Sequence, residues 1–237
     1  MADSGPELIL TSDGSHSLRS PLFGESYHSL HGAVQESSHV YIRAGLAYAH
    51  ERYSGASELS ILELGFGTGL NALLSLLYAF EQGLSIHYAA IEAYPIDAEL
   101  AARLNYALVL SLTEAESALF MEMHRLPWGK VGRLSTGRMG RVANMSLEKR
   151  HGFFEELSDE EAYELVYYDA FAPSVQPDCW NMEMVKKVRR ALRPGGVLTT
   201  FSAQGAFRRR LQAAGFEVER LPGPPGKREM LRATLPF

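Results

Sequence analysis

A carboxylate and three glycines in alternate positions occur together in the segment Glu63-Leu64-Gly65-Phe66-Gly67-Thr68-Gly69. Glycine adopts positive φ and has no Cβ, so a glycine-rich turn lets the backbone approach a ligand closely. The dinucleotide-binding pattern G-x-G-x-x-G would need glycine at position 70, where this chain has Leu70. A phosphate-binding loop of the P-loop type would need a following lysine, which is absent. The segment therefore predicts a binding loop for a ligand without phosphate.

Two further acids end apolar runs that read as strands. Glu92 follows the run Ile86 to Ile91, and its two carboxylate oxygens could accept both hydroxyls of a ribose. Asp169 follows the run Leu165 to Tyr168. Because ligands of open α/β sheets bind beyond the carboxyl ends of the strands, Asp169 is expected beside the glycine loop, where it could bind an alkylammonium group and help to deprotonate it. The alternatives are a tight turn with a solvated acid and an acid that caps a loop.

The pattern acid-x-G-x-G-x-G is similar to motif I of class I S-adenosylmethionine-dependent methyltransferases, whose cofactor has an ammonium group and no phosphate. Longer strings resemble the MnmC methyltransferase-domain family, and they extend from Thr11 to Met230. They are Thr11-Ser12-Asp13-Gly14-Ser15, Tyr27-His28-Ser29, Glu63 to Asn71, Asp169-Ala170-Phe171-Ala172-Pro173, Arg193-Pro194-Gly195-Gly196 and Gly226-Lys227-Arg228-Glu229-Met230.

The resemblance implies S-adenosylmethionine as cofactor and tRNA as partner. The implied reaction is N-methylation of the 5-aminomethyl group of a wobble (2-thio)uridine, with Asp169 as the catalytic acid/base and Glu92 as the ribose acceptor. Cofactor-binding positions are expected at Glu63, Gly65, Phe66, Gly67, Thr68, Gly69, Asn71, Glu92, Gly152 and Phe153. Substrate-binding positions are expected at Tyr27, Phe171, Pro173, Lys227 and Arg228.

The chain departs from the family pattern in two places. Two-domain members carry a flavin oxidoreductase that produces the aminomethyl group, and this chain has no room for it, so a separate enzyme is expected to supply that precursor. Many relatives have H-G-D where this chain has His151-Gly152-Phe153. A contact with the adenine amino group is therefore expected from backbone groups or from Glu155.

Alternating strands and helices are predicted to position these residues. Strands are predicted at 59–64, 86–91, 142–149, 165–168, 197–201, 216–221 and 230–235, and helices at 36–53, 70–80, 97–108, 181–192 and 206–214. A hairpin over 8–20 turns at Asp13-Gly14. The predicted fold is α/β, a class I methyltransferase (Rossmann-like) parallel sheet with an antiparallel C-terminal edge hairpin. Residues 1–57 are expected to form a small N-terminal extension and residues 58–237 the methyltransferase domain.

Composition bounds the class of protein. The chain has 237 residues, 46% hydrophobic and 22% charged, which is ordinary for a globular protein. The net charge of −5 argues against coating nucleic acid by charge alone, although Lys227 and Arg228 could meet tRNA phosphates. The single cysteine, Cys179, excludes an internal disulfide and a cysteine-based zinc site, and it fits the cytoplasm. No metal site is expected from the spacing of His28, His31 and His39, and no run is apolar enough to span a membrane.

Two other functions remain open from the sequence. A polyamine aminopropyltransferase would share the fold and the acid after the fourth strand, but would need a further acidic site for its diamine. A non-catalytic RNA-binding or scaffold protein would also share the fold, and it would not bind the cofactor. Acceptor profiling separates the first alternative, and cofactor binding separates the second.

Overall fold

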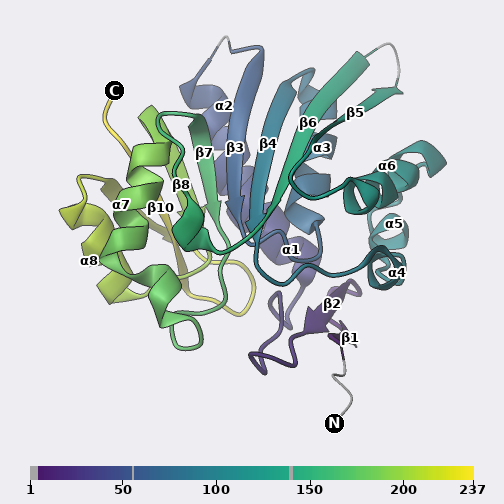
Figure 1. The fold of residues 1–237 in the computed structure, drawn as a ribbon, viewed down its shortest axis with the longest axis horizontal. Helices are drawn as coiled ribbons and strands as arrows, with labels where there is room; N and C mark the ends of the chain where they lie inside the picture. Colours follow the sequence, from purple (N-terminus) through teal and green to yellow (C-terminus); the bar gives the residue numbers. More distant parts are fainter. Residues whose placement is uncertain (1–4, 55, 139–140) are drawn as a thin grey trace.

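The structure is a computed structural model that describes residues 5–54, 56–138 and 141–237. Within these ranges one sheet has the strand order β5-β6-β4-β3-β7-β8-β10-β9 (Figure 1). The strands are β3 (Glu58–Leu64), β4 (Ser85–Glu92), β5 (Val131–Arg138), β6 (Arg141–His151), β7 (Tyr163–Tyr168), β8 (Leu192–Thr200), β9 (Glu217–Pro222) and β10 (Glu229–Thr234). From β6 to β8 all neighbours are parallel, whereas β10 is antiparallel to both β8 and β9. The predicted parallel sheet with an antiparallel C-terminal hairpin is confirmed.

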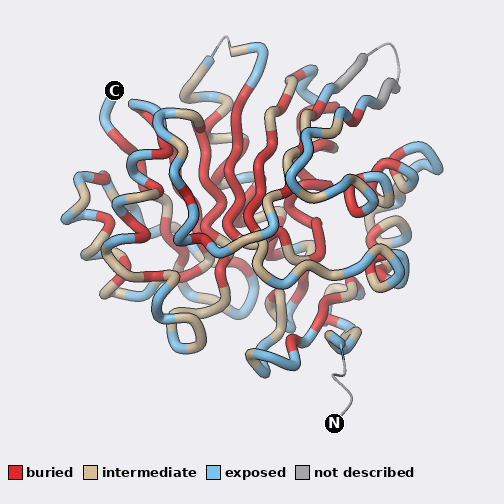
Figure 2. The backbone as a smooth tube through the Cα atoms, viewed as in Figure 1, coloured by how far each residue is buried: buried red, intermediate tan, exposed pale blue. Residues whose placement is uncertain are grey.

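The central strands are buried on both faces. Every residue of β7 is buried, and β3 is buried after its first residue. Strands covered on both faces carry nearly continuous apolar runs, as these do. Alternate residues of β3 contribute to different cores, Ile61 to one and Leu62 to the other. Figure 2 shows this buried centre, with exposed residues concentrated on the surrounding helices and loops.

Helices cover both faces of the sheet. Helix α3 (Leu70–Gln82) packs into the core of Ile61, and α7 (Met182–Ala191) and α8 (Gly205–Ala213) pack into the core of Leu62. In Figure 1, α3 lies behind the sheet and α7 in front of it. The side chain of Asn181 caps α7 by accepting a hydrogen bond from Met184 N at 2.9 Å. Short 3-10 segments, η2 (Phe154–Glu156) and η3 (Pro177–Trp180), follow β6 and β7.

The N-terminal elements lie beyond the C-terminal ends of the parallel strands and behind the sheet (Figure 1). Strands β1 (Glu7–Leu10) and β2 (His16–Arg19) form the predicted hairpin. The helix predicted over 36–53 is observed as α1 (Ala33–Ser37), η1 (Ser38–Ala47) and α2 (Tyr48–Arg52) in direct succession, and η1 is hydrogen-bonded as a π-helix. The division of the chain into an extension and a domain at residue 57 stays a prediction.

The region between β4 and β6 differs from the sequence prediction. The single helix predicted over 97–108 is wrong, because the structure has two short helices, α4 (Ala98–Ala101) and α5 (Tyr106–Val109). Asp97 does cap α4, but Asn105 interrupts the helix by bonding to the N-terminal hairpin at His16 N (2.7 Å) and Gly14 O (2.8 Å). Helix α6 (Glu114–Arg125) and the antiparallel edge strand β5 were not predicted.

Candidate active site

The glycine loop joins β3 to α3 through three residues with positive φ. The values are 97° at Gly65, 49° at Gly67 and 73° at Gly69. A Cβ on Gly65 would lie 2.6 Å from the backbone oxygen of Asp169, and one on Gly67 would lie 3.1 Å from the Tyr27 ring. The absence of side chains at these positions therefore lets the loop pack against the end of β7 and against Tyr27. Tyr27 belongs to the N-terminal segment, residues 5–54.

Glu92, the last residue of β4, binds the glycine loop. Its Oε2 accepts a hydrogen bond from Gly67 N at 2.9 Å, and its Oε1 accepts one from Tyr94 N at 2.8 Å. Burial raises the pKa of the Glu92 carboxyl, and the bond from Gly67 opposes that rise. Each carboxylate oxygen keeps a second acceptor position, so Glu92 can still accept hydrogen bonds from hydroxyl groups.

Asp169 is held by donors from two other elements. The Tyr41 hydroxyl of η1 donates to Asp169 Oδ1 at 2.5 Å, and Asn71 Nδ2 of α3 donates to Asp169 Oδ2 at 2.8 Å. The same Asn71 amide donates to Glu63 Oε1 at 2.8 Å. Asn71 thus faces both carboxyl groups with its amide nitrogen. Its Oδ1 has no hydrogen-bond partner among the described residues.

The electrostatic environment places Asp169 near its titration point at neutral pH. Burial raises the pKa of Asp169 to about 7, while the hydrogen bonds from Tyr41 and Asn71 lower it. Among nearby charges, Glu36 raises this pKa and Lys227 lowers it. A carboxyl group with such a pKa can accept a proton from a bound group near pH 7. Burial also raises the pKa of Glu63 well above its ordinary value.

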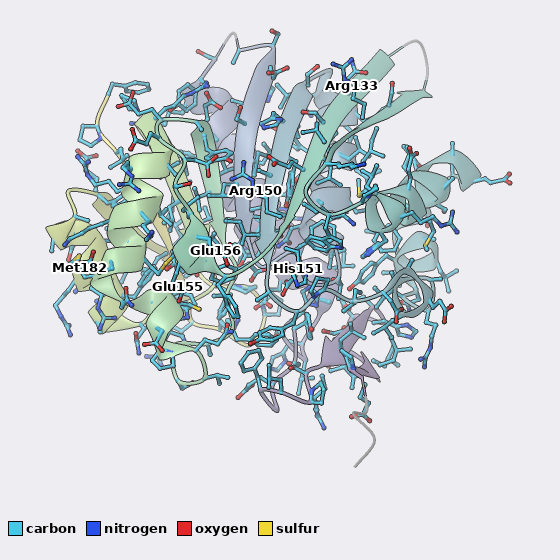
Figure 3. The ribbon with its side chains drawn as sticks, viewed as in Figure 1. Arg133, Arg150, His151, Glu155, Glu156 and Met182 are labelled. Carbon is cyan, nitrogen blue, oxygen red and sulfur yellow. The ribbon has the colours of Figure 1, made fainter. Side chains whose placement is uncertain are left out.

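A cavity of about 530 Å³ connects the loop, Glu92 and Asp169. Predicted site residues that line it are Tyr27, Gly65, Phe66, Gly67, Thr68, Asn71, Glu92, Phe153, Asp169, Phe171 and Lys227. Five other predicted positions, Glu63, Gly69, Gly152, Pro173 and Arg228, are not among its lining residues. Glu63 lies fully buried beneath the loop, and Gly152 N instead donates to Glu92 O at 3.0 Å. In Figure 3, His151, Glu155 and Glu156 lie toward the C-terminal ends of the parallel strands, and Arg133 lies toward the opposite end of the sheet.

Aromatic rings surround the cavity on the side of the N-terminal segment. The Phe171 ring contacts Phe23 at a centroid distance of 4.8 Å and Tyr27 at 5.2 Å. The Phe153 ring is 55% exposed and lies edge-on to Tyr94 at 6.3 Å. Burial, with a contribution from Glu92, raises the pKa of Tyr27 to about 12, so its hydroxyl stays protonated. The exposed Phe153 ring thus gives position 153 an aromatic surface, where the H-G-D pattern has an aspartate carboxylate.

An ion pair between Lys227 and Glu36 lines the cavity. Lys227 Nζ lies 2.5 Å from Glu36 Oε2 and 3.9 Å from the centre of the Phe201 ring. Glu36 is buried, and its Oε1 accepts a hydrogen bond from Ser29 N at 2.8 Å. This pair ties α1 to the turn between β9 and β10. Lys227 is thus engaged within the protein, whereas Arg228 is exposed.

His28 connects the N-terminal segment to the glycine loop. It is buried, its Nδ1 lies 2.9 Å from Ser17 Oγ, and its Nε2 lies 3.5 Å from Thr68 Oγ1. Burial lowers its pKa to about 4, so the ring is neutral at pH 7. The described residues contain no group of three or more histidine, cysteine or carboxylate side chains arranged to hold a metal ion. His28 thus makes polar contacts with Ser17 and Thr68.

Sequence reasoning did not single out Tyr41, Glu36 or Tyr94 as site residues. Tyr41 contacts Asp169 across 128 positions of the chain, a distance that no local pattern reveals. Glu36 reaches the site through its ion pair with Lys227, 191 positions later in the chain.

The site fits S-adenosylmethionine in three respects. The loop residues Gly65 to Thr68 line the cavity, Glu92 offers acceptor positions for a ribose, and Asn71 Oδ1 is a buried acceptor without a partner among the described residues. An unpartnered buried acceptor suits a ligand that brings its own donor, such as an ammonium group. Among the lining residues Lys227 is the only lysine or arginine, and it is neutralised by Glu36, so the cavity favours a cationic ligand.

Comparison with known proteins decides the family. A family model described as S-adenosyl-L-methionine-dependent methyltransferase matches residues 141–236. The bifunctional tRNA 5-methylaminomethyl-2-thiouridine biosynthesis protein MnmC of Caulobacter sp. (strain K31) is 32% identical over 228 residues, which cover 92% of this chain. This chain belongs to the MnmC methyltransferase-domain family. It spans 37% of the length of that MnmC relative.

Solved structures agree with the fold. The crystal structure of MNMC2 from Aquifex aeolicus matches 100% of this chain and 73% of its own, with a TM-score of 0.74 and 24% identity. A probable spermidine synthase from Corynebacterium glutamicum matches 97% of this chain and 76% of its own, with a TM-score of 0.53 and 18% identity. The second match shows that this fold also occurs in a protein described as a probable spermidine synthase, so the fold alone does not identify the acceptor.

The comparisons confirm the family, fold and cofactor predicted from the sequence. No helix in the described part of the chain is long and apolar enough to cross a membrane. The residue-by-residue site assignments stay predictions.

Proposed function

We propose that this methyltransferase N-methylates the 5-aminomethyl group of a (2-thio)uridine at the tRNA wobble position and so produces 5-methylaminomethyluridine. The observation that carries the proposal is the joint placement of Asp169, Glu92 and the glycine loop around one cavity. An acid poised to take a proton near pH 7 is what an alkylammonium acceptor requires. The similarity to a protein named for tRNA 5-methylaminomethyl-2-thiouridine biosynthesis supports this acceptor.

The cofactor would be held by residues from β3, α3 and β4. Glu92 would accept the ribose hydroxyls, and the backbone from Gly65 to Gly69 would lie against the methionine portion. Asn71 Oδ1 would accept a hydrogen bond from the cofactor's ammonium group, while Glu63 would fix the Asn71 amide from below. When bound, S-adenosylmethionine supplies a methyl group on a sulfonium, from which an amine can take it in one in-line displacement.

Asp169 would prepare the acceptor amine. An alkylamine is largely protonated near pH 7 and has no free lone pair in that form. The Asp169 carboxylate would bind the ammonium form, accept its proton and leave the neutral amine in place for attack. Holding the nitrogen in one position also contributes strongly, because a fixed near-attack geometry removes much of the entropic cost of the reaction.

The acceptor base would stack against aromatic residues at the mouth of the cavity. Unpaired bases are commonly bound by aromatic side chains, and Tyr27, Phe171 and Phe23 provide adjoining rings beside Asp169. Arg228 is exposed on the β9–β10 turn and is the better candidate for a phosphate contact, since Lys227 is paired with Glu36. Pro173 would act indirectly, by shaping the segment that carries Phe171.

The precursor would come from another reaction. The aminomethyl group must be exposed on the uridine before this enzyme can act, so a separate enzyme that removes a larger substituent would precede it. We propose that both steps take place in the cytoplasm. This compartment contains tRNA and is reducing, which fits the free thiol of Cys179.

The test is methyl transfer from labelled S-adenosylmethionine to bulk tRNA from cells that lack this protein, followed by nucleoside mass spectrometry. Conversion of 5-aminomethyl- to 5-methylaminomethyluridine by the wild-type chain, and its loss in Asp169→Ala, is the expected result. Cofactor binding without transfer to tRNA would overturn the acceptor assignment, and putrescine and spermidine would then be tried as acceptors with decarboxylated S-adenosylmethionine. Absence of cofactor binding would favour the non-catalytic alternative.

A further inference from the structure

Tyr41 touches the reacting carboxylate without touching the cavity. Its hydroxyl donates to Asp169 Oδ1 at 2.5 Å, yet Tyr41 is 1% exposed and is not among the residues that line the cavity. Burial raises the pKa of the Tyr41 hydroxyl well above its ordinary value, with Asp169 as the next cause. The hydroxyl therefore stays protonated and acts toward Asp169 only as a donor.

The position of Tyr41 depends on an irregular segment of helix. Tyr41 lies on η1, and short π-helical insertions often occur at functional sites because they shift a side chain relative to its helix. Its ring packs on Tyr167 at a centroid distance of 5.2 Å. Gly45, one turn further along, lets η1 approach the sheet closely, since a Cβ there would lie 2.9 Å from Thr199 Oγ1 and 3.3 Å from the Tyr167 ring. This contact holds the hydroxyl at the end of β7.

We propose that Tyr41 is a positioning residue that fixes the Asp169 carboxylate and stabilises its ionised form for proton transfer from the acceptor. The inference rests on the proposed function of Asp169 as the base. Tyr41 binds one carboxylate oxygen and Asn71 the other, so the carboxylate cannot rotate without losing a charge-assisted hydrogen bond. The remaining acceptor position on each oxygen is then presented in one orientation to a group in the cavity.

Other ionisable groups also face Asp169, so the effect of Tyr41 must be separated from theirs. Glu36 on α1 raises the pKa of Asp169, and Lys227 on the β9–β10 turn lowers it. Glu63 on β3 and Tyr88 on β4 interact electrostatically with the same carboxylate. These groups act through charge at a distance, whereas the Tyr41 hydroxyl and the Asn71 amide donate hydrogen bonds directly to it.

The test compares Tyr41→Phe with Tyr167→Phe. Both remove one buried phenol hydroxyl, but the hydroxyl of Tyr167 bonds to Ser75 Oγ at 3.0 Å and does not bond to Asp169. Loss of the Tyr41 donor should raise the pKa of Asp169 by about one to two units, the equivalent of a hydrogen bond to a charged group. From a starting value near 7, kcat at pH 7 should fall roughly fivefold to fiftyfold and recover as pH rises above the new pKa.

A second measurement determines the pKa of Asp169 and does not depend on methyl transfer. Carbon-13 NMR of protein labelled at aspartate carboxyl carbons, assigned with Asp169→Asn, gives the pKa of Asp169 directly in each variant. An upward shift in Tyr41→Phe and none in Tyr167→Phe is expected. Equal pKa values in Tyr41→Phe and the wild type, or an activity loss that is the same at every pH, would overturn the proposal. A shifted pKa in a protein that fails to methylate tRNA would retain the positioning role and refute only the acceptor assignment.

Discussion

Replacement of Gly65 by alanine tests whether the loop and Asp169 form one unit. Gly65 has a φ of 97°, and its Cβ would overlap the backbone oxygen of Asp169 at 2.6 Å. A left-handed backbone conformation costs a residue with a Cβ about 1–2 kcal/mol. Overpacking against backbone that cannot rotate away adds about 1–3 kcal/mol. Gly65→Ala should therefore lower the free energy of unfolding by about 2–5 kcal/mol.

A matched control separates strain from overlap. Gly83 ends α3 with a φ of 68°, and a Cβ there would have no atom within 4 Å. Gly83→Ala should therefore lose only the conformational cost of about 1–2 kcal/mol and bind the cofactor normally. Urea denaturation measures stability, and calorimetric titration measures S-adenosylmethionine affinity. If Gly65→Ala were no less stable than Gly83→Ala and bound the cofactor with wild-type affinity, the close approach of loop and Asp169 would not exist as described.

Three further substitutions test the remaining contacts. Burial raises the pKa of Asp169 from 3.8 to about 7, so ionisation of this carboxyl group destabilises the folded state. In urea titrations, the stability of the wild type should therefore fall relative to that of Asp169→Asn as pH rises between these two values. A stability difference that does not change with pH would refute the pKa shift. Glu92→Gln should weaken S-adenosylmethionine binding by about 1.5–3 kcal/mol in calorimetric titration, through loss of charge-assisted hydrogen bonds. Lys227→Met leaves the buried Glu36 carboxylate without its cation and should cost about 1–3 kcal/mol of stability in urea denaturation. The exposed neighbour serves as its control, since Arg228→Met should stay within about 0.5 kcal/mol of the wild type.

Elements with strong local signals were predictable from the sequence. The central strands carry continuous apolar runs, and the last two strands lack an intervening helix, which fixes their antiparallel pairing. The region between β4 and β6 was not predictable in the same way. Asn105 breaks the expected helix by binding a hairpin some 90 positions earlier in the chain, a contact invisible to local propensity. Helix α6 does carry a local signal in the sequence, the capping box formed by Thr113 and Glu116.

The same distinction explains which parts of the site were predicted. The glycine loop, Glu92 and Asp169 each follow a strand, so a rule about the carboxyl ends of parallel strands brings them together. The groups that shift the pKa of Asp169 come mostly from outside these strand ends. Tyr41 and Glu36 belong to the N-terminal segment, and Lys227 belongs to the turn between β9 and β10. These contacts depend on how η1 and α1 pack on a finished sheet.

The N-terminal segment therefore contributes side chains to the proposed site as well as covering it. It donates a hydrogen bond to Asp169 through Tyr41, adds a negative charge through Glu36 and walls the cavity with Tyr27. Without this segment, Asp169 would be a strand-end acid with one side-chain donor, Asn71 of α3. With the segment in place, the carboxylate is desolvated, held at both oxygens and close to its titration point at neutral pH. The fold resembles that of a probable spermidine synthase, so the proposed choice of acceptor would depend on the groups around Asp169, among them Tyr41 and Glu36.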